Sequence, residues 1–177
     1  METMMCKLKT AFLFILLFSG NVIFAQDRDE ESSEVNEDEF HHCFFSHNSV
    51  TLGLGTTYSI PHEQAGISGR VYFNTHEKWC IGPEFSYIRK GDKNLADLNL
   101  VVHYIFETPL VGIYPVVGAN YSYEAEQEHS ESSFGMVYGG GVHRNFKKVS
   151  IFSEYTRVQG KISDQFISAG MIFTFKL

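Results

Sequence analysis

The chain has 177 residues and a formal net charge of −7; 44% of its residues are hydrophobic and 15% are aromatic. This length fits a single domain, and the composition excludes disordered, collagen-like and disulfide-dense proteins. The acidic character also argues against nucleic acid as a partner, because nucleic-acid phosphates bind to basic surfaces.

The first 25 residues have the features of a secretory signal peptide. Lys7 and Lys9 precede an apolar run over residues 11–18, and the segment ends on a small residue, Ala25. The apolar run is too short to cross a bilayer as a helix, which needs about 20 residues. We therefore expect residues 1–25 to be removed on export, with a retained membrane anchor as the alternative.

Residues 26–47 form a separate, strongly acidic segment. The run 27–39 holds eight acidic residues against Arg28 alone, so it carries nearly all of the net charge. Like charges in sequence bury no apolar surface, so we expect a disordered tail that acts as a spacer, with a cation-binding or docking arm as the alternative. The folded body is then residues 48–177, which is close to neutral.

A group of potential metal ligands lies at the end of this tail. It consists of His41, His42, Cys43 and His47. Their spacing matches no standard zinc pattern, so no metal site and no cofactor are predicted.

From residue 49 onward, apolar and polar residues alternate with a period of two, which indicates β-strands. In the first segment, for example, Leu52 and Leu54 alternate with Gly53 and Gly55. Eight segments follow this pattern, at about 49–60, 65–75, 77–90, 94–106, 110–123, 132–145, 148–158 and 163–177.

The polar face of these segments distinguishes two kinds of barrel. It is rich in Gly, Ser and Thr and carries few charges, whereas roughly a quarter to a third of a soluble surface is charged. Small side chains suit the narrow lumen of an eight-stranded barrel whose apolar side chains face lipid. We predict an all-β fold, an eight-stranded antiparallel up-and-down transmembrane β-barrel. A soluble, secreted, lipocalin-like barrel that binds a small apolar ligand is the alternative.

The connections between segments predict the orientation. One set is tight (74–78, 107–109, 145–148), and the alternate set contains the longest and most acidic connection, Glu124–Ser132. Short turns on one side and longer loops on the other are typical of outer-membrane barrels. We therefore expect the termini and the acidic tail on the short-turn, periplasmic side. Glu124–Ser132 is interpreted as a solvated surface loop, with an adhesive contact as the alternative.

The last segment carries a resemblance to a known family. Ser168, Gly170, Phe173 and Phe175 occupy the defined positions of the terminal-strand signal that the outer-membrane barrel assembly machinery reads. Together with residues 81–87 and 114–121, this pattern resembles small outer-membrane β-barrel proteins (porin-family, OmpA/OmpX-like), especially those of Bacteroidetes-type bacteria. The chain departs from the family by ending in Lys-Leu instead of an aromatic residue.

This resemblance implies a location in the bacterial outer membrane, with membrane lipid and the barrel assembly machinery as partners, and a monomeric state. It also implies a non-enzymatic structural, adhesive or envelope-integrity role. A lipid-modifying barrel enzyme is a second alternative. However, Ser153 and Glu154 are consecutive residues of one strand, so their side chains would face opposite sides of the sheet and could not act together.

Two prolines conflict with the strand pattern, because proline cannot donate a hydrogen bond to a sheet. Pro83 and Pro115 both occupy strand positions that are predicted to face lipid. We expect a β-bulge at each of them.

Several charged and titratable side chains occupy strand positions that face the lumen, and they predict a charge network there. They are Arg70, Glu84, Asp97, His103, His143 and Glu154. A lone charge in a narrow lumen costs several kcal/mol unless it is paired, so a network of Arg70 with Glu84 and Glu154 is expected. An ion path or gate is the functional alternative.

Two cysteines belong to the exported chain. Cys43 and Cys80 both fall near the periplasmic rim of the predicted barrel, in an oxidising compartment. They either form a disulfide or remain apart because Cys80 points into the lumen.

Overall fold

A computed structural model describes residues 49–76, 78–126, 129–146 and 149–176 of this chain. The signal peptide and the acidic tail predicted above lie outside the described residues. None of the described residues belongs to a helix long and apolar enough to cross a membrane. The strands are β1 (Ser49–Ser59), β2 (Gln64–His76), β3 (Trp79–Lys90), β4 (Lys93–Tyr104), β5 (Phe106–Glu107), β6 (Gly112–Glu126), β7 (His129–Phe146), β8 (Val149–Gly160) and β9 (Asp164–Lys176).

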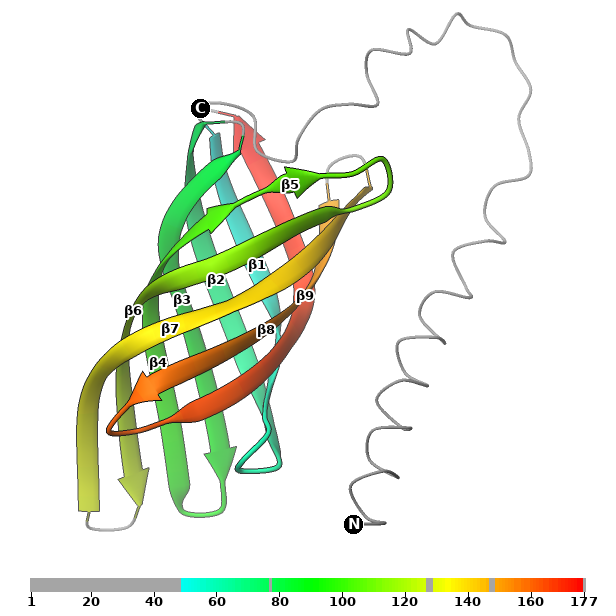
Figure 1. Cartoon of the computed structure of the whole chain (residues 1–177). Helices are drawn as coiled ribbons and strands as arrows, with labels where there is room; N and C mark the ends of the chain where they lie inside the picture. Colours follow the sequence, from blue (N-terminus) through cyan, green and yellow to red (C-terminus); the bar gives the residue numbers. More distant parts are fainter. Residues whose placement is uncertain (1–48, 77, 127–128, 147–148, 177) are drawn as a thin grey trace, which may run out of the picture. The chain divides into compact units, whose positions relative to one another are not determined.

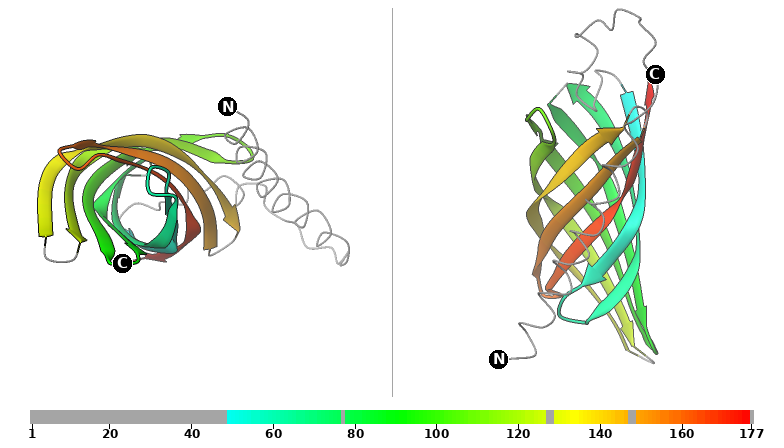
Figure 2. Two further views of the ribbon diagram at one scale, coloured as in Figure 1. Left: turned by 90° about the horizontal axis from the view of Figure 1, so that it is seen from below. Right: turned by 90° about the vertical axis from the view of Figure 1, so that its right-hand side faces the viewer.

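These strands form one closed antiparallel barrel (Figure 1). Strands that follow one another in sequence pair, except that β4 pairs with β6 and not with β5. β1 pairs with β9 along its whole length, from Ser49–Lys176 to Ser59–Phe166, which closes the sheet. The view along the barrel in Figure 2 shows the ring of strands around a central lumen.

The short strand β5 continues β4 and does not add a ninth position to the ring. β4 pairs with β6 at His103–Val116, and β5 pairs with β6 at Phe106–Ile113 in the same register. Between them the amide of Ile105 donates a hydrogen bond to the carbonyl of Lys78 instead. The predicted eight-stranded up-and-down topology is therefore confirmed.

The alternation of residues along each strand separates an apolar exterior from a polar interior. On β1 the outward Leu54 is 70% exposed, while the inward Thr57 is 1% exposed. The same division holds on β4, where Leu98 and Leu100 are exposed and Asp97 is buried. Because successive side chains of a strand point to opposite faces, a period of two is sufficient to sort them. This division confirms the parity predicted from the sequence and excludes a barrel with its apolar rows inside.

The predicted contrast between short turns and long loops is wrong. The acidic segment is not a loop, because Glu124 pairs with Glu131 and Glu126 pairs with His129 as β6 and β7 continue. β7 pairs with β8 only from Gly135 onward, so the start of β7 extends beyond β8. This projecting β6–β7 hairpin is visible at the lower left of Figure 1.

The expected bulges at the two prolines are also absent from the described ladders. The register between β2 and β3 is the same at Arg70–Glu84 and at Phe73–Ile81, on the two sides of Pro83. Pro115 pairs with Gly140 in an unbroken register. A proline lacks only the one N–H that would point to one neighbouring strand, so the barrel loses a hydrogen bond locally without inserting a residue. The register between β2 and β3 shifts near the end of β2 instead, between Asn74 and His76.

Aromatic side chains gather outside the barrel near both of its ends. Trp79 contacts Tyr104 with ring centroids 4.8 Å apart, and Tyr104 contacts Phe106 in the same way. Towards the projecting hairpin, Tyr121 contacts Phe134 at 4.9 Å. Amphipathic rings at the two rims of an apolar belt are typical of transmembrane barrels.

Candidate functional site

The barrel lumen holds all six charged or titratable residues that the sequence pattern predicts to face inward. Arg70 comes from β2, Glu84 from β3, Asp97 and His103 from β4, His143 from β7 and Glu154 from β8, and every one of these side chains is buried. They fall into two clusters, one around Arg70 and one around Asp97.

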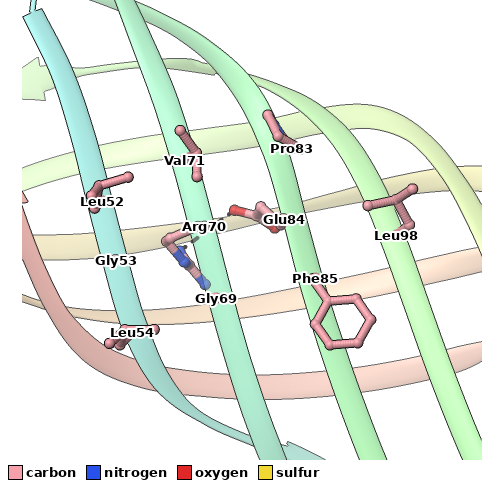
Figure 3. Close-up of a pocket in the computed structure, with 10 residues that line it drawn as sticks. All are labelled: Leu52, Gly53, Leu54, Gly69, Arg70, Val71, Pro83, Glu84, Phe85 and Leu98. Atoms are coloured by element: carbon pink, nitrogen blue, oxygen red, sulfur yellow. Dashed lines mark ion pairs between the residues drawn. The ribbon is translucent and has the colours of Figure 1, made fainter.

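Arg70 lies at the centre of the first cluster. Its Nη1 is 3.2 Å from Glu154 Oε2 and 3.5 Å from Glu84 Oε1. Nη2 donates a second, longer hydrogen bond of 3.5 Å to Glu154 Oε1, and the guanidinium carbon lies 3.9 Å from the centre of the Phe152 ring. Figure 3 shows the Arg70 and Glu84 side chains reaching toward each other between adjacent strands. Because an isolated buried charge is costly, this pairing makes the cluster tolerable in the lumen.

Two tyrosines complete the first cluster. The Tyr72 hydroxyl donates a hydrogen bond to Glu84. The His103 ring lies between the rings of Tyr72 and Tyr114, 4.9 Å from each, and Tyr114 in turn stacks on His143 at 5.6 Å. The sequence analysis did not single out these two tyrosines, because an aromatic ring suits both lipid and a packed lumen. Their parity, opposite to that of the neighbouring Phe73 and Ile113, was the available signal.

Glycines on the inward face make room for these large side chains. A Cβ atom on Gly53 would meet the Arg70 side chain, one on Gly112 would meet the His143 ring, and one on Gly141 would meet the Tyr114 ring. The small residues of the polar face are therefore fitted to particular large ones. The middle of the lumen is packed with side chains, as expected for a barrel of this size.

Asp97 lies in the second cluster, away from Arg70. The Asn120 amide donates hydrogen bonds to Asn99 Oδ1 at 2.7 Å and to Asp97 Oδ1 at 3.2 Å. The Ser122 hydroxyl also donates to Asp97. Asp97 is therefore stabilised by neutral hydrogen-bond donors. This differs from the sequence prediction, which placed Asp97 in one network with Arg70.

A further polar contact joins the first and last strands. The Ser59 hydroxyl lies 2.9 Å from both carboxylate oxygens of Asp164, and His62 Nε2 lies 3.7 Å from Asp164 Oδ2. The serine contacts the carboxylate directly, with no histidine between them, so this group lacks the order of a hydrolytic triad.

The geometry around Ser153 does not support the alternative of a lipid-modifying enzyme either. The Ser153 side chain is exposed on the outer face, whereas Glu154 points into the lumen. His143 is also in the lumen, so a nucleophile at Ser153 would have neither a base nor an orienting acid on its own side.

The four residues of the predicted terminal-strand signal lie on β9 next to β1. Ser168 faces the lumen and donates a hydrogen bond to Thr57 Oγ1 at 3.0 Å. Phe173 and Phe175 are exposed on the outer face, and Gly170 packs against the backbone of Leu54. The residues predicted to form the assembly signal therefore lie on the strand that closes the barrel.

The cysteine prediction stays open. Cys80 is buried on the lumen side of β3. Its proposed partner Cys43, like the ligand-rich residues His41, His42 and His47, lies outside the described residues.

The outer surface has a shallow hollow above the first cluster. The residues that line it include Gly69 and the outward side chains of Leu54, Val71 and Leu98 (Figure 3). The lining is apolar on this side, so the hollow suits an acyl chain better than a polar substrate.

Comparison with known proteins identifies the fold. No family model and no curated protein matches the sequence. Among solved structures, the N-terminal β-barrel domain of Pseudomonas aeruginosa OprF is similar at a TM-score of 0.60 and 14% identity, covering 73% of this chain and 98% of that one. Ail, the attachment invasion locus protein of Yersinia pestis, is similar at 0.55 and 16% identity, covering 73% and 100%. Neisserial surface protein A is similar at 0.53 and 15% identity, covering 72% and 96%.

These similarities span nearly the whole of each solved chain. This chain therefore has the fold of the small eight-stranded outer-membrane barrels, as predicted. The matched proteins give no support to an origin among Bacteroidetes-type bacteria.

Proposed function

We propose that this protein is an integral barrel of the bacterial outer membrane that has a packed lumen and a non-enzymatic role at the cell envelope. The exposed apolar exterior carries this proposal. Large apolar side chains on all eight long strands are exposed, while charged side chains such as Arg70 and Glu154 are buried inside. Only a solvent that favours apolar groups, such as lipid, is compatible with this arrangement.

The location can be tested by fractionation and gel migration. We expect the protein in the outer-membrane fraction, extracted by detergent, and migrating faster on a gel when it is not heated than when it is boiled. Recovery of folded protein in the soluble periplasmic fraction without detergent would contradict the proposal.

Within the envelope, we propose that the β6–β7 hairpin provides a contact surface outside the cell. The hairpin carries Glu124, Glu126 and Glu131, and it projects beyond β8. Two of these acids have cationic neighbours: Lys93 Nζ lies 2.9 Å from Glu124, and Lys161 pairs with Glu131. Partly exposed ion pairs of this kind contribute little to stability, so they leave the acids available to a partner.

The similarity to Ail supports an adhesive role, since that protein is named for attachment and invasion. Ail has also been solved with sucrose octasulfate, a heparin analogue. The acidic hairpin of this chain would repel such a polyanion. We therefore propose a cation-rich partner, or a surface bridged by divalent cations, for this protein.

The adhesive role is tested by neutralising the hairpin. We expect the triple variant Glu124→Gln, Glu126→Gln, Glu131→Gln to fold normally and to reduce binding of cells to cationic surfaces. Glu107→Gln is the matched control, because Glu107 is an exposed acid at the opposite end of the barrel. Unchanged adhesion of the triple variant would leave only a structural or envelope-integrity role.

The remaining expectations also stay proposals. We propose that the barrel is a monomer, that it binds outer-membrane lipid, and that the assembly machinery recognises Ser168, Gly170, Phe173 and Phe175. A lipid-modifying activity is disfavoured by the separation of Ser153 from Glu154 across the strand. An assay for lipid A modification by membranes that contain the protein would test this point.

A further inference from the structure

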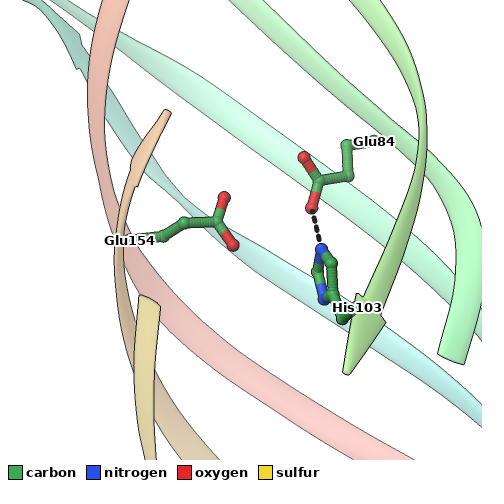
Figure 4. A group of neighbouring side chains, drawn as sticks. All are labelled: Glu84, His103 and Glu154. Carbon is green, nitrogen blue, oxygen red and sulfur yellow. Dashed lines mark ion pairs between the residues drawn. The ribbon is translucent and has the colours of Figure 1, made fainter. Parts of the chain in front are cut away.

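The lumen brings together three potential metal ligands from three strands. Glu84, His103 and Glu154 each offer one ligand atom, and these atoms lie within 4.8 Å of one another (Figure 4). All three side chains are buried. One imidazole nitrogen and two carboxylate oxygens form a donor set that suits zinc and the neighbouring divalent metals.

The His103 nitrogen supplies an independent indication of a ligand. His103 is 3% exposed, and its Nε2 has no hydrogen-bond partner among the residues that the structure describes. Buried polar atoms are nearly always paired, so an unpaired one points to a bound water or ion. In Figure 4 this nitrogen faces Glu84, with Glu154 across the lumen.

The distance from His103 to Glu84 favours an ion over a water molecule. Nε2 lies 3.7 Å from Glu84 Oε1, which is too long for a hydrogen bond. A bridging water with two normal hydrogen bonds would hold these atoms about 4.4 Å apart. Two ligands of a tetrahedral zinc ion stand about 3.3 Å apart, so the observed pair needs only a small adjustment.

The charges of the cluster also attract a cation. Two carboxylates face one guanidinium, which leaves one negative charge in excess when both carboxylates are ionised and His103 is neutral. Arg70 holds the carboxylates from its own side, 3.2 Å from Glu154 and 3.5 Å from Glu84. Arg70 is therefore a competitor for the same oxygens, and Glu154 must turn from Arg70 toward His103 to complete the site.

We propose that Glu84, His103 and Glu154 bind one divalent transition-metal ion of the zinc class inside the barrel, and that Arg70 limits its affinity. The three ligands come from β3, β4 and β8, so a bound ion ties opposite walls of the barrel together. This site is independent of the surface role proposed above, which requires no metal.

The experiment uses the mature chain, refolded in detergent with zinc and then passed through gel filtration. Because His41, His42, Cys43 and His47 could bind zinc themselves, every sample carries His→Asn and Cys→Ser replacements at these four positions. We expect about one zinc ion per chain by mass spectrometry of the metal. With Co²⁺ in place of zinc, we expect a visible absorption band typical of nitrogen and oxygen ligands.

Two variants of proposed ligands and one control variant test the site. His103→Gln and Glu154→Gln are expected to lose the bound ion and the cobalt band, although they still fold by circular dichroism and unheated gel migration. His62→Gln is the matched control, because His62 lies beside the separate carboxylate Asp164, and it should keep both signals. Equal metal content in His103→Gln and in the tail-replaced parent chain would overturn the proposal, and so would the absence of bound zinc from that parent chain.

Arg70→Gln separates a metal site from a purely structural cluster. Removing the competing cation should strengthen zinc binding at least tenfold, whereas a merely structural loss would weaken it. A weaker or unchanged affinity in folded Arg70→Gln would contradict the proposal. If this variant does not fold, the comparison of His103→Gln with His62→Gln decides the question.

Discussion

Arg70 connects β2 and β8, two strands that are not neighbours in the sheet. Its contacts with Glu154 and the Phe152 ring span the lumen, while its contact with Glu84 stays between paired strands. This arrangement makes Arg70 the central residue of the packed lumen, since it satisfies two carboxylates at once.

We expect Arg70→Ala to lower the free energy of unfolding by about 3–5 kcal/mol, because it leaves two buried carboxylates without their cation. Urea titration in detergent, followed by unheated gel migration, measures this loss. Arg144→Ala is the control, since Arg144 is exposed on β7 and its loss should change stability by no more than about 0.5 kcal/mol.

Arg70→Ala should nevertheless open no measurable conductance in a planar bilayer. Tyr72, Tyr114 and Phe152 remain in the lumen and are each almost fully buried. A steady ion current through the variant would show that Arg70 acts as a gate, and the packed-lumen proposal would then be wrong.

The lumen glycines give a second test at this scale. Gly53→Ala places a methyl group against the Arg70 side chain, so we expect a loss of about 1–3 kcal/mol from overpacking. The neighbouring Gly69 faces outward, and the nearest atoms to its Cβ position are 3.9 Å away. Gly69→Ala is therefore the matched control, with stability nearly unchanged. Equal losses in both variants would contradict the fitted packing of Arg70 against Gly53.

The alternation along each strand was sufficient to predict which residues face the lumen, but not which of them contact one another. The sequence alternation assigns Arg70 and Glu154 to the same face, yet their contact depends on barrel closure, which joins residues 84 positions apart. The same limit explains why Asp97 was grouped with Arg70 when it contacts Asn120 and Ser122. Tyr72 and Tyr114 were missed because an aromatic ring suits both lipid and a packed lumen.

At the scale of elements, the β6–β7 hairpin shows why charge is a weak signal for a loop. Its acidic residues predicted a solvated loop, but the segment continues as paired strands. Glu124 and Glu126 also pair with β4, at Leu95 and Lys93 respectively, so the neighbouring strand supports this part of β6. Outside the belt that faces lipid, water solvates charged side chains on a strand as readily as on a loop. Strand length in this region is therefore decided by pairing rather than by polarity.

The closing strand β9 carries a prediction about assembly. We expect the double variant Phe173→Ala, Phe175→Ala to reduce folded protein in the outer membrane of cells, because the assembly machinery would no longer recognise the terminal strand. The same variant should refold into detergent micelles nearly as well as the parent chain, since that reaction needs no machinery.

Phe85→Ala is the control for β9, because Phe85 is also an outward-facing phenylalanine, exposed on β3. It should affect the yield in cells much less than the double variant does. An equal loss in the two cases would mean that apolar surface in general, and not the terminal signal, determines assembly.

At the scale of the whole molecule, closure makes the interior and the exterior interdependent. A closed ring of eight strands leaves no free sheet edge, so every strand can be exposed to lipid without unpaired backbone groups. It also fixes a narrow lumen, in which Arg70, Tyr114 and His143 fit because glycines lie beside them. The apolar exterior and the packed polar interior are two results of the same alternation along the strands.

The single tryptophan of the chain reports on how the whole barrel sits in a bilayer. Trp79 is 47% exposed on the outer face and contacts Tyr104 near one end of the barrel. In vesicles of brominated lipid we expect stronger fluorescence quenching when bromine lies near the headgroup than when it lies near the bilayer centre. The variant Trp79→Phe, Leu100→Trp moves the tryptophan to an exposed position within β4, and its preference should shift toward the deep bromine. If neither protein is quenched, the apolar exterior does not face lipid and the membrane-spanning arrangement is wrong.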